Sequence, residues 1–465
     1  MAVGAWYRRA LALAGAICAL VPALAMWGFT VDDALISLRY AHHIASGAGY
    51  RFDAHGPPTD GVTPLPWAPL VVPLTSGADL VSALERVKAV GVVVWTVAGA
   101  ALGHALSRRA GGERTATIHA GIGLVVVALA FPIGAWAASG METGAATALA
   151  TFAAVSFDRP RRAAIFAGLA ATFRPELVVW SVTLASGAAI ADRGPGRARR
   201  AATTAAIAFA PFALCAVVRL TVFGRAAPLA VLAKPSDLAH GVLYAAAASL
   251  VVLLPLLAFA PVALRRASPL AKTIATAALV HVLVVVAVGG DWMPYARLLV
   301  PVAPSLALVF VDLGRVAHPA STIGRALVAI VLGVVIALRA APAGRHVHEA
   351  RKHLIAEARP VLADAKVIAA LDIGWVGAAT DATIIDLAGL TDPAIAVLPG
   401  GHTSKAVDLG MLLDRNVDTI VVYGEPRIVE QRLLRTPLFR EKFDAVATLS
   451  FGSQRLQRYD VYRRR

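Results

Sequence analysis

The sequence predicts a polytopic α-helical membrane protein with a small C-terminal α/β domain. Of its 465 residues, 58% are hydrophobic and 16% are charged, and the mean hydropathy is +0.68. These values are typical of membrane proteins and not of soluble domains of this size. Long apolar segments recur between short clusters of Lys and Arg, as transmembrane helices do. From about residue 345 the composition becomes polar, which predicts a water-exposed domain.

The N-terminal apolar segment and those that follow are predicted to be transmembrane helices. At 1.5 Å per residue, about 20 apolar residues cross a bilayer. We expect about eleven transmembrane helices, at roughly 10–29, 87–106, 116–137, 143–157, 163–173, 177–191, 201–219, 241–264, 270–288, 296–313 and 322–340. The short pair 163–173 and 177–191 is interpreted as a hairpin that reaches part-way through the bilayer, which is tolerated where backbone lines a cavity. One long kinked helix is the alternative.

The basic clusters predict how the chain is oriented in the membrane. They lie at Arg8–Arg9, Arg108–Arg114, Arg159–Arg162, Arg193–Arg200, Arg265–Arg266 and Arg315. The positive-inside rule places them in the cytoplasm. The N-terminus is then cytoplasmic and the C-terminal domain extracytoplasmic. The net charge of +15 is thereby explained by topology, so nucleic acid is not an expected partner. A kinked helix at 158–200 would invert everything downstream.

Residues 345–465 are expected to form the α/β domain, and residues 1–344 the transmembrane domain. Short apolar runs, typical of strands, alternate with amphipathic stretches. The runs lie at 367–371, 383–387, 418–423 and 445–450, and the amphipathic stretches at 404–415 and 426–438. No Gly-x-Gly-x-x-Gly follows a run, which disfavours dinucleotide binding. The cysteines, Cys18 and Cys215, lie in apolar segments, which disfavours a disulfide framework or a thiolate metal site.

The candidate polar motifs all fall on the predicted outer face. They are Asp32-Asp33 with Arg39, the run 59–63, Glu142, Arg174 with Glu176, Lys234, and Asp291 with Arg297. A carboxylate can take the proton from an acceptor hydroxyl in glycosyl transfer. Arginine and lysine can neutralise a phosphate leaving group. Both kinds of residue on one face fit an enzyme that uses a sugar linked to a lipid phosphate.

Several of these motifs resemble the GT-C glycosyltransferase superfamily, and within it the mycobacterial terminal arabinofuranosyltransferase (AftB-like) family. The run 32–41 (DDALISLRYA) is similar to the first outer loop of that superfamily. Further similar runs follow in order: DGVTPLPW (60–67), SGMET (139–143), FRPE (173–176), FG…P…AK (223–234), GGDWMP…R…P (289–301) and DLAGLTD (386–392). Phe173, Leu177 and Ala227-Pro228-Leu229 depart from the family pattern, which leaves sugar and acceptor open.

The resemblance implies a multi-pass enzyme of the bacterial inner membrane that works on its outer side. The donor would be a polyprenyl-phosphate-linked sugar, for example arabinofuranose, and the acceptor an extracytoplasmic glycan or protein. Asp32 or Asp33 would be catalytic, with the first acid of the pair favoured. Arg174, Lys234 and Arg297 would bind the donor phosphate. Substrate contacts would come from Arg39, Thr63, Trp67, Glu142, Glu176, Asp291 and Trp292.

Alternatives remain open at this stage. No metal or other cofactor is required by the resemblance, although Asp32, Asp33 and Asp291 could supply oxygen ligands to a divalent cation. Arg174 and Arg297 could instead form structural pairs with Glu176 and Asp291, and Trp67 and Trp292 could be interface anchors. The whole protein could be a transporter or flippase for lipid-linked glycans, or a non-catalytic envelope-assembly protein whose C-terminal domain binds glycan.

Overall fold

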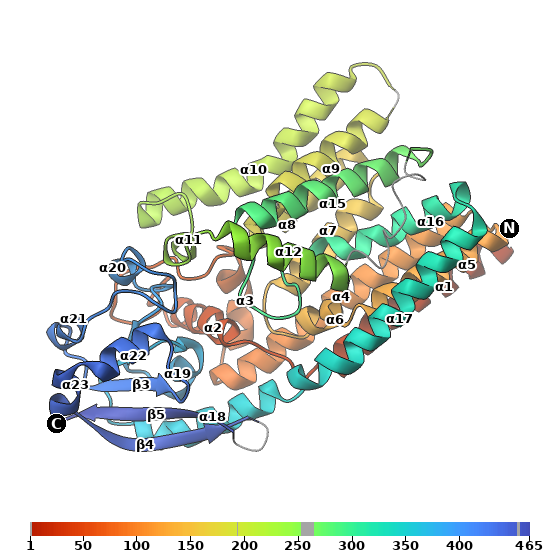
Figure 1. Cartoon of the computed structure of the whole chain (residues 1–465). Coiled ribbons are helices and arrows are strands. Elements are labelled where there is room, and N and C mark those ends of the chain that lie inside the picture. Colours follow the sequence, from red (N-terminus) through yellow and green to blue (C-terminus); the bar gives the residue numbers. More distant parts are fainter. Residues whose placement is uncertain (1, 193, 253–264, 453–455) are drawn as a thin grey trace. The chain divides into compact units, whose positions relative to one another are not determined.

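The computed structural model describes residues 2–192, 194–252, 265–452 and 456–465, with the side chains of residues 2–4 left aside (Figure 1). Its contacts divide the chain into two units, each made of three separate stretches of sequence. Unit 1 contains the residues up to 29, then 88–214 and 236–345. Unit 2 contains residues 30–87, 215–235 and 346–465.

Unit 1 is made of helices. They are α1 (Ala2–Ala25), most of α4 (Leu80–Ala110), α5 (Arg114–Leu129), α6 (Phe131–Ala137), α7 (Thr143–Val155), α8 (Pro160–Phe173), η1 (Pro175–Leu177), α9 (Val178–Ala191), most of α10 (Arg197–Phe223), α12 (Leu238–Val252), α15 (Pro269–Ala287), η2 (Val300–Ser305), α16 (Leu306–Val316) and α17 (Pro319–Gly344). Small residues allow close packing: a Cβ on Gly15 of α1 would lie 2.2 Å from the carbonyl oxygen of Gly99 in α4. Such contacts are typical of membrane helices.

Membrane-length helices are fewer than the eleven expected, and that number is not supported. In the described ranges five helices are long and apolar enough to cross a membrane, or six if α5 and α6, bent by 61°, count as one span. The long ones are α1, α4, α10, α15 and α17 running on into α18 (Val347–Leu362). This content is consistent with a membrane protein. The expected segment 241–264 lies partly outside the described residues, which stop at 252.

Proline accounts for several of the short helices. A proline lacks the N–H that an α-helix needs and its ring disturbs the preceding turn. Pro175 separates α8 from α9, and Pro132 lies at the bend between α5 and α6. Pro301 and Pro304 turn the start of the expected helix 296–313 into the 3₁₀ helix η2. Helices α8 and α9 pack against each other, and the Ser181 hydroxyl donates to the Ala167 carbonyl at 2.7 Å.

Unit 2 combines short helices with one sheet. Its helices are α2 (Asp32–Ala45), α3 (Trp67–Thr75), the first turns of α4, the end of α10, α11 (Leu229–Ala233), α18, α19 (Ile373–Ala379), α20 (Pro393–Ala396), α21 (Leu409–Asp414), α22 (Ile428–Arg435) and α23 (Pro437–Lys442). Its strands are β1 (Val367–Ala370), β2 (Thr383–Asp386), β3 (Thr419–Tyr423), β4 (Phe443–Phe451) and β5 (Gln457–Arg464).

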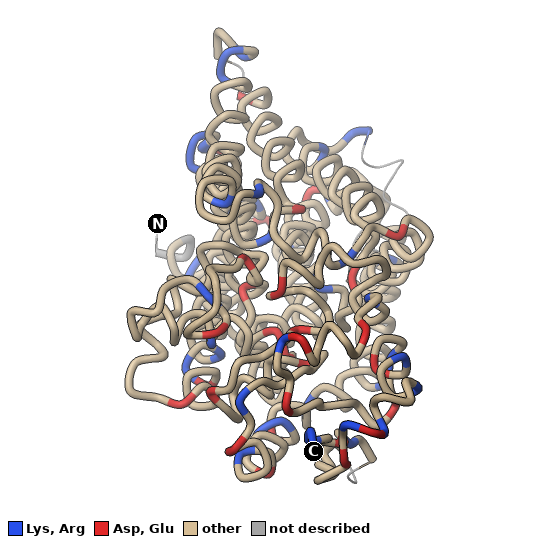
Figure 2. Tube along the Cα trace, turned by 90° about the vertical axis from the view of Figure 1, so that its left-hand side faces the viewer, with Lys and Arg blue, Asp and Glu red and all other residues tan. Residues whose placement is uncertain are grey.

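Near the C-terminus, basic and acidic residues alternate along the trace (Figure 2).

The five strands form one mixed sheet in the order β2-β1-β3-β5-β4. Strands β2, β1 and β3 are parallel, with Ile368 opposite Ile384, and β5 is antiparallel to both of its neighbours. A buried core that includes Ile385, Leu412 and Ile420 covers the sheet. Each of the four apolar runs expected to be strands overlaps one, β1 to β4 in order. The fifth strand, β5, was not expected.

Candidate functional site

The structure distributes the predicted site residues over both units. Unit 2 contains Asp32, Asp33, Arg39, Thr63, Trp67 and Lys234, whereas unit 1 contains Glu142, Arg174, Glu176, Asp291, Trp292 and Arg297.

Asp32, the first residue of α2, has three protein partners for its carboxylate. Its carboxylate accepts the backbone N–H groups of Gly374 at 2.7 Å and Trp375 at 2.9 Å, and it pairs with Arg351 of α18. The side chain is 16% exposed. Burial raises the pKa of Asp32 to about 6, and the positive charge of Arg351 opposes that rise. Asp32 therefore joins α2 to the C-terminal part of unit 2.

Asp33 follows directly and has different surroundings. Its side chain is half-buried. In the described part of the chain, no hydrogen-bond donor or cation lies within bonding distance of its carboxylate, and the Ser37 hydroxyl donates to its backbone oxygen at 3.4 Å. Of the two acids, Asp33 is the one whose carboxylate is open to a ligand.

Arg39 lies two turns along α2 and is fully engaged by the protein. Its guanidinium donates to Asp53 at 3.3 Å and to four backbone carbonyls within 2.9 Å, those of Phe52, Gly377, Thr380 and Ala382. The side chain is buried. Every nitrogen of the guanidinium thus has a protein acceptor, so the structure gives Arg39 a scaffolding position.

The run 59–67 packs in the same unit. The Tyr40 hydroxyl lies 2.6 Å from the Thr59 hydroxyl and accepts the Gly61 N–H at 3.1 Å. The Asp60 carboxylate pairs with Arg219 at 2.7 Å, and Arg219 also donates to the Thr63 carbonyl. Trp67 is buried at the start of α3, with 6% of its surface exposed. The contacts of this run are therefore made with other parts of unit 2, through side chains as well as backbone groups.

The run 386–392 packs against the run 59–67 at Gly61. A Cβ on Gly61 would lie 2.6 Å from both the Thr391 methyl and the Tyr40 hydroxyl, so the two runs touch at a glycine. Asp386 is fully buried and accepts the backbone N–H groups of Ala388 at 2.8 Å and Thr391 at 2.7 Å. Burial raises its pKa to about 7. Asp386 thus shapes the loop after β2.

The segment 215–235 brings cations to unit 2. The Leu229 N–H donates to the Asp60 carbonyl at 3.3 Å, and α11 packs against α20. Lys234 caps the C-terminal end of α11 and is half-buried. Among the described residues it has no acid within ion-pair distance. Nearby in sequence, Arg225 has a buried Nε without a hydrogen-bond partner in the same described ranges.

The residues of unit 1 form a cluster of paired charges. Arg174, at the break between α8 and η1, donates to Glu142 at 2.9 Å and to Glu176 at 2.7 Å. Arg297 pairs with Asp291 at 2.6 Å. Glu142 and Arg174 are buried. Three carboxylates face two guanidinium groups, so the cluster has a net charge of −1 when all are ionised.

This pairing is the arrangement that a structural role predicts for Arg174 and Arg297. A phosphate site needs an excess of positive charge, and the unit 1 cluster has none of its own. Trp292 is 64% exposed and stacks on His240, with ring centroids 4.2 Å apart. Lys234 is the one of the three predicted phosphate-binding cations for which the described chain shows no acidic partner.

Some residues that matter were missed by sequence reasoning. Arg351, Arg219 and Asp53 hold the predicted motif in place, yet none of them is among the candidate residues found in the sequence. Their partners lie 319, 159 and 14 residues away. No local pattern signals pairs as distant as the first two. In the described ranges no group of three or more His, Cys, Asp or Glu residues is arranged to hold a metal ion.

Comparison with known proteins adds one finding. A family model described as a domain of unknown function, DUF8728, matches residues 345–462. No curated protein and no solved structure matches the chain. The class supported by composition and fold is a helical membrane protein with a small sheet-containing part.

Proposed function

We propose that this protein is a membrane glycosyltransferase. It would transfer a sugar, for example arabinofuranose, from a polyprenyl-phosphate donor to an extracytoplasmic glycan or protein acceptor. The observation that carries the proposal is the unequal Asp32–Asp33 pair. One carboxylate is held by Arg351 and two backbone N–H groups, and its neighbour is half-buried with no protein partner in the described ranges. A fixed neighbour beside an open carboxylate suits a positioned general base.

In this proposal Asp33 is the base and Asp32 a positioning residue. The acceptor hydroxyl attacks the anomeric carbon of the sugar while its proton passes to the Asp33 carboxylate. The bond between that carbon and the phosphate oxygen breaks, and the phosphate leaves with the electron pair. The resemblance favoured the first acid, whereas the contacts of Asp32 favour the second.

The leaving phosphate needs positive charge. Lys234 and Arg225, both on the segment 215–235 of unit 2, are the cations proposed to supply it. Neither has an acidic side chain at ion-pair distance in the described part of the chain, and Asp60, the acid that acts on Arg225 from further away, is paired with Arg219. Arg174 and Arg297 are each paired with carboxylates, and we assign them to the scaffold of unit 1.

Turnover by the purified full-length protein tests the assignment. The assay supplies polyprenyl-phosphate arabinofuranose and an oligosaccharide acceptor in detergent. Asp33→Asn is expected to lower the rate by about 10²–10⁴ without a change in unfolding temperature. Asp364→Asn, an exposed acid after α18 in the same unit, is the matched control and should retain the wild-type rate.

Asp32→Asn separates positioning from catalysis. It leaves Arg351 without its carboxylate, so we expect a loss of about 1–3 kcal/mol of stability together with reduced turnover. Wild-type turnover in Asp33→Asn would refute the base assignment. If wild type transfers no sugar but moves labelled lipid-linked glycan across a vesicle membrane, the transporter alternative replaces the proposal.

A further inference from the structure

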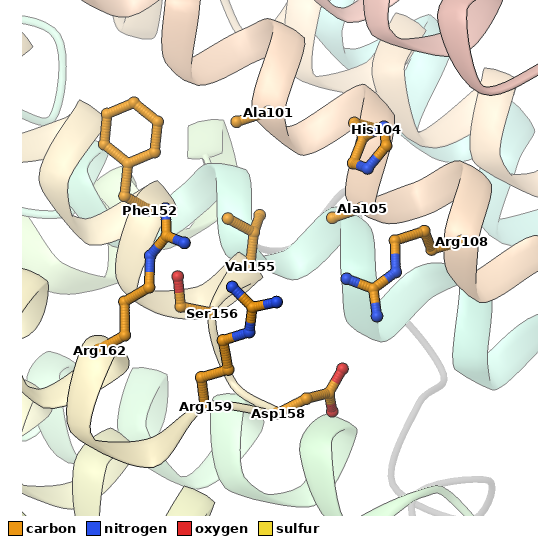
Figure 3. Close-up of a pocket in the computed structure, with 10 residues that line it drawn as sticks. All are labelled: Ala101, His104, Ala105, Arg108, Phe152, Val155, Ser156, Asp158, Arg159 and Arg162. Atoms are coloured by element: carbon orange, nitrogen blue, oxygen red, sulfur yellow. The ribbon is translucent and has the colours of Figure 1, made fainter. Parts of the chain in front are cut away.

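A pocket of about 590 Å³ opens in unit 1 where α4 ends and α8 begins (Figure 3). Arg108 of α4, Arg159 before α8 and Arg162 within α8 turn their guanidinium groups toward this space, and His104 lies on the same side of α4. The three arginines are exposed. They belong to the basic clusters that the sequence analysis explained by topology alone.

The positive charge of this pocket is not neutralised by the protein. Asp158 also lines it, but its carboxylate lies 3.6 Å from Arg109, which does not. Among the described residues no acid lies within ion-pair distance of Arg108, Arg159 or Arg162. An anion is therefore the expected occupant. Guanidinium groups bind phosphate oxygens through paired hydrogen bonds, more strongly than neutral donors do.

Part of the pocket lining is apolar. Ala101 and Ala105 of α4 face Phe152 and Val155 of α7 across it. A free phosphate ion would gain no binding energy from these apolar side chains. A phospholipid would place its headgroup among the arginines and its glycerol and acyl atoms against the apolar side chains, which adds about 25 cal/mol for each Å² of apolar surface buried.

A second pocket, of about 810 Å³, adjoins the first and shares Arg159 and Arg162 with it. It adds Arg161, Arg199 and Arg200, with Asp192 as its acid. Together the two pockets are lined by six arginines and two aspartates, which leaves a net charge of +4. Adjoining cationic pockets that share two arginines can each receive one phosphate of the same molecule.

We infer that the two pockets form a binding site for the headgroup of an anionic phospholipid that carries two phosphate groups. The site lies at the ends of apolar helices, where headgroups are found, and basic pockets between membrane helices are known to bind such lipids. The inference is independent of the proposed catalytic residues, since none of them lines either pocket.

Native mass spectrometry of the full-length protein in neutral detergent tests this site. The added probes are diphosphatidylglycerol, phosphatidylglycerol, phosphatidylcholine and inorganic phosphate. We expect diphosphatidylglycerol to bind at least about tenfold more tightly than phosphatidylcholine. The double variant Arg159→Gln/Arg162→Gln should lose about tenfold or more of that affinity. Arg159→Lys/Arg162→Lys should lose less, because the charge remains and only the paired hydrogen bonds go.

The matched control is Arg265→Gln/Arg266→Gln, which removes the same charge from an exposed basic pair outside both pockets. It should change lipid affinity by less than about twofold. If the two glutamine variants lose lipid affinity equally, the lipid responds to the overall positive charge and not to these pockets, and the proposed site is overturned. If inorganic phosphate binds as tightly as the lipids do, the lipid assignment is overturned. If the first double variant does not fold, Arg108→Gln is compared with the same control.

Discussion

Asp32 and Asp33 have the same side chain and adjacent positions, but the fold uses them differently. The helix turns by about 100° between them, so Asp32 meets α19 and Arg351 while Asp33 does not. A buried carboxylate is stable only if donors or cations compensate for its lost hydration. Asp32 has such compensation from the protein. Asp33, half-buried and without it in the described residues, would gain it from a bound hydroxyl.

Asp386 provides a pH-dependent prediction for stability. Its pKa is about 7 in the folded protein, and about 3.9 is usual for an unfolded chain. Between about pH 4 and 7 the folded state therefore holds a proton that the unfolded state has lost, so stability falls as the pH rises through this range. We expect the slope, at most about 1.4 kcal/mol per pH unit, to be absent in Asp386→Asn.

Thermal unfolding of the full-length protein at several pH values measures this slope. Asp386→Asn should also be less stable throughout, by about 1–3 kcal/mol, because one of its two side-chain acceptors becomes an amide donor. Asp364→Asn serves as the exposed control and should keep the wild-type slope. An unchanged slope in Asp386→Asn would show that other groups produce the pH dependence.

At the scale of elements, the contact of α2 with α19 depends on a glycine. A Cβ on Gly374 would lie 2.1 Å from the Asp32 backbone oxygen and 2.7 Å from its carboxylate. An alanine is normally the better helix former by about 1 kcal/mol. Here the helix must approach closely enough for its Gly374 N–H to reach Asp32, and the added methyl group prevents it.

Gly374→Ala is therefore expected to destabilise the protein by about 1–3 kcal/mol and to lower sugar transfer together with it. Gly121→Ala in α5 is the control, because nothing lies within 4 Å of its added Cβ, and it should be neutral or slightly stabilising. Unfolding temperatures and turnover of both variants measure the effect. Equal stability of the two variants would mean that α19 can move away from α2 without cost.

Several elements were predictable because their signal is local. Alternating apolar runs predicted β1 to β4. Strand β5 was missed because Gln457–Arg464 carries four charges in eight residues, and its pairing with β3 and β4 outweighs that composition. The expected eleven membrane crossings are not supported, because apolar runs were counted as spans even where proline shortens the helices.

At the scale of the whole molecule, the sequence could not predict which segments fold together. The change in composition predicts a boundary after residue 344, whereas the contacts group residues 30–87 and 215–235 with 346–465. The candidate residue types were identifiable from motifs. Their pairing was not, because the partner of Asp32 is 319 residues away and nothing near either residue specifies it.

Orientation in the membrane is the prediction that belongs to this scale. Reporter fusions after Arg162 and after Arg345 should report opposite sides, cytoplasm for the first. Between these points the described residues contain three membrane-length helices, α10, α15 and α17, and an odd number of crossings changes the side. The basic clusters predict the direction. If both fusions report cytoplasm, the number of crossings between them is even. The C-terminal domain would then lie on the side of the membrane where the proposed donor is not used.

The long separations within unit 2 also affect how the protein is made. Asp32 leaves the ribosome 342 residues before Gly374, its hydrogen-bond donor. At about 5–20 residues per second, this delay is about 17–70 s. During that time Asp32 has none of its side-chain partners, and Arg39 has only Phe52 and Asp53. The side of α2 that packs against α19 is uncovered, whereas α3 can already pack on α2. We therefore expect that an arrest of translation before residue 346 leaves α2 without its contacts to α18 and α19 and makes it more sensitive to proteolysis than in the full-length protein.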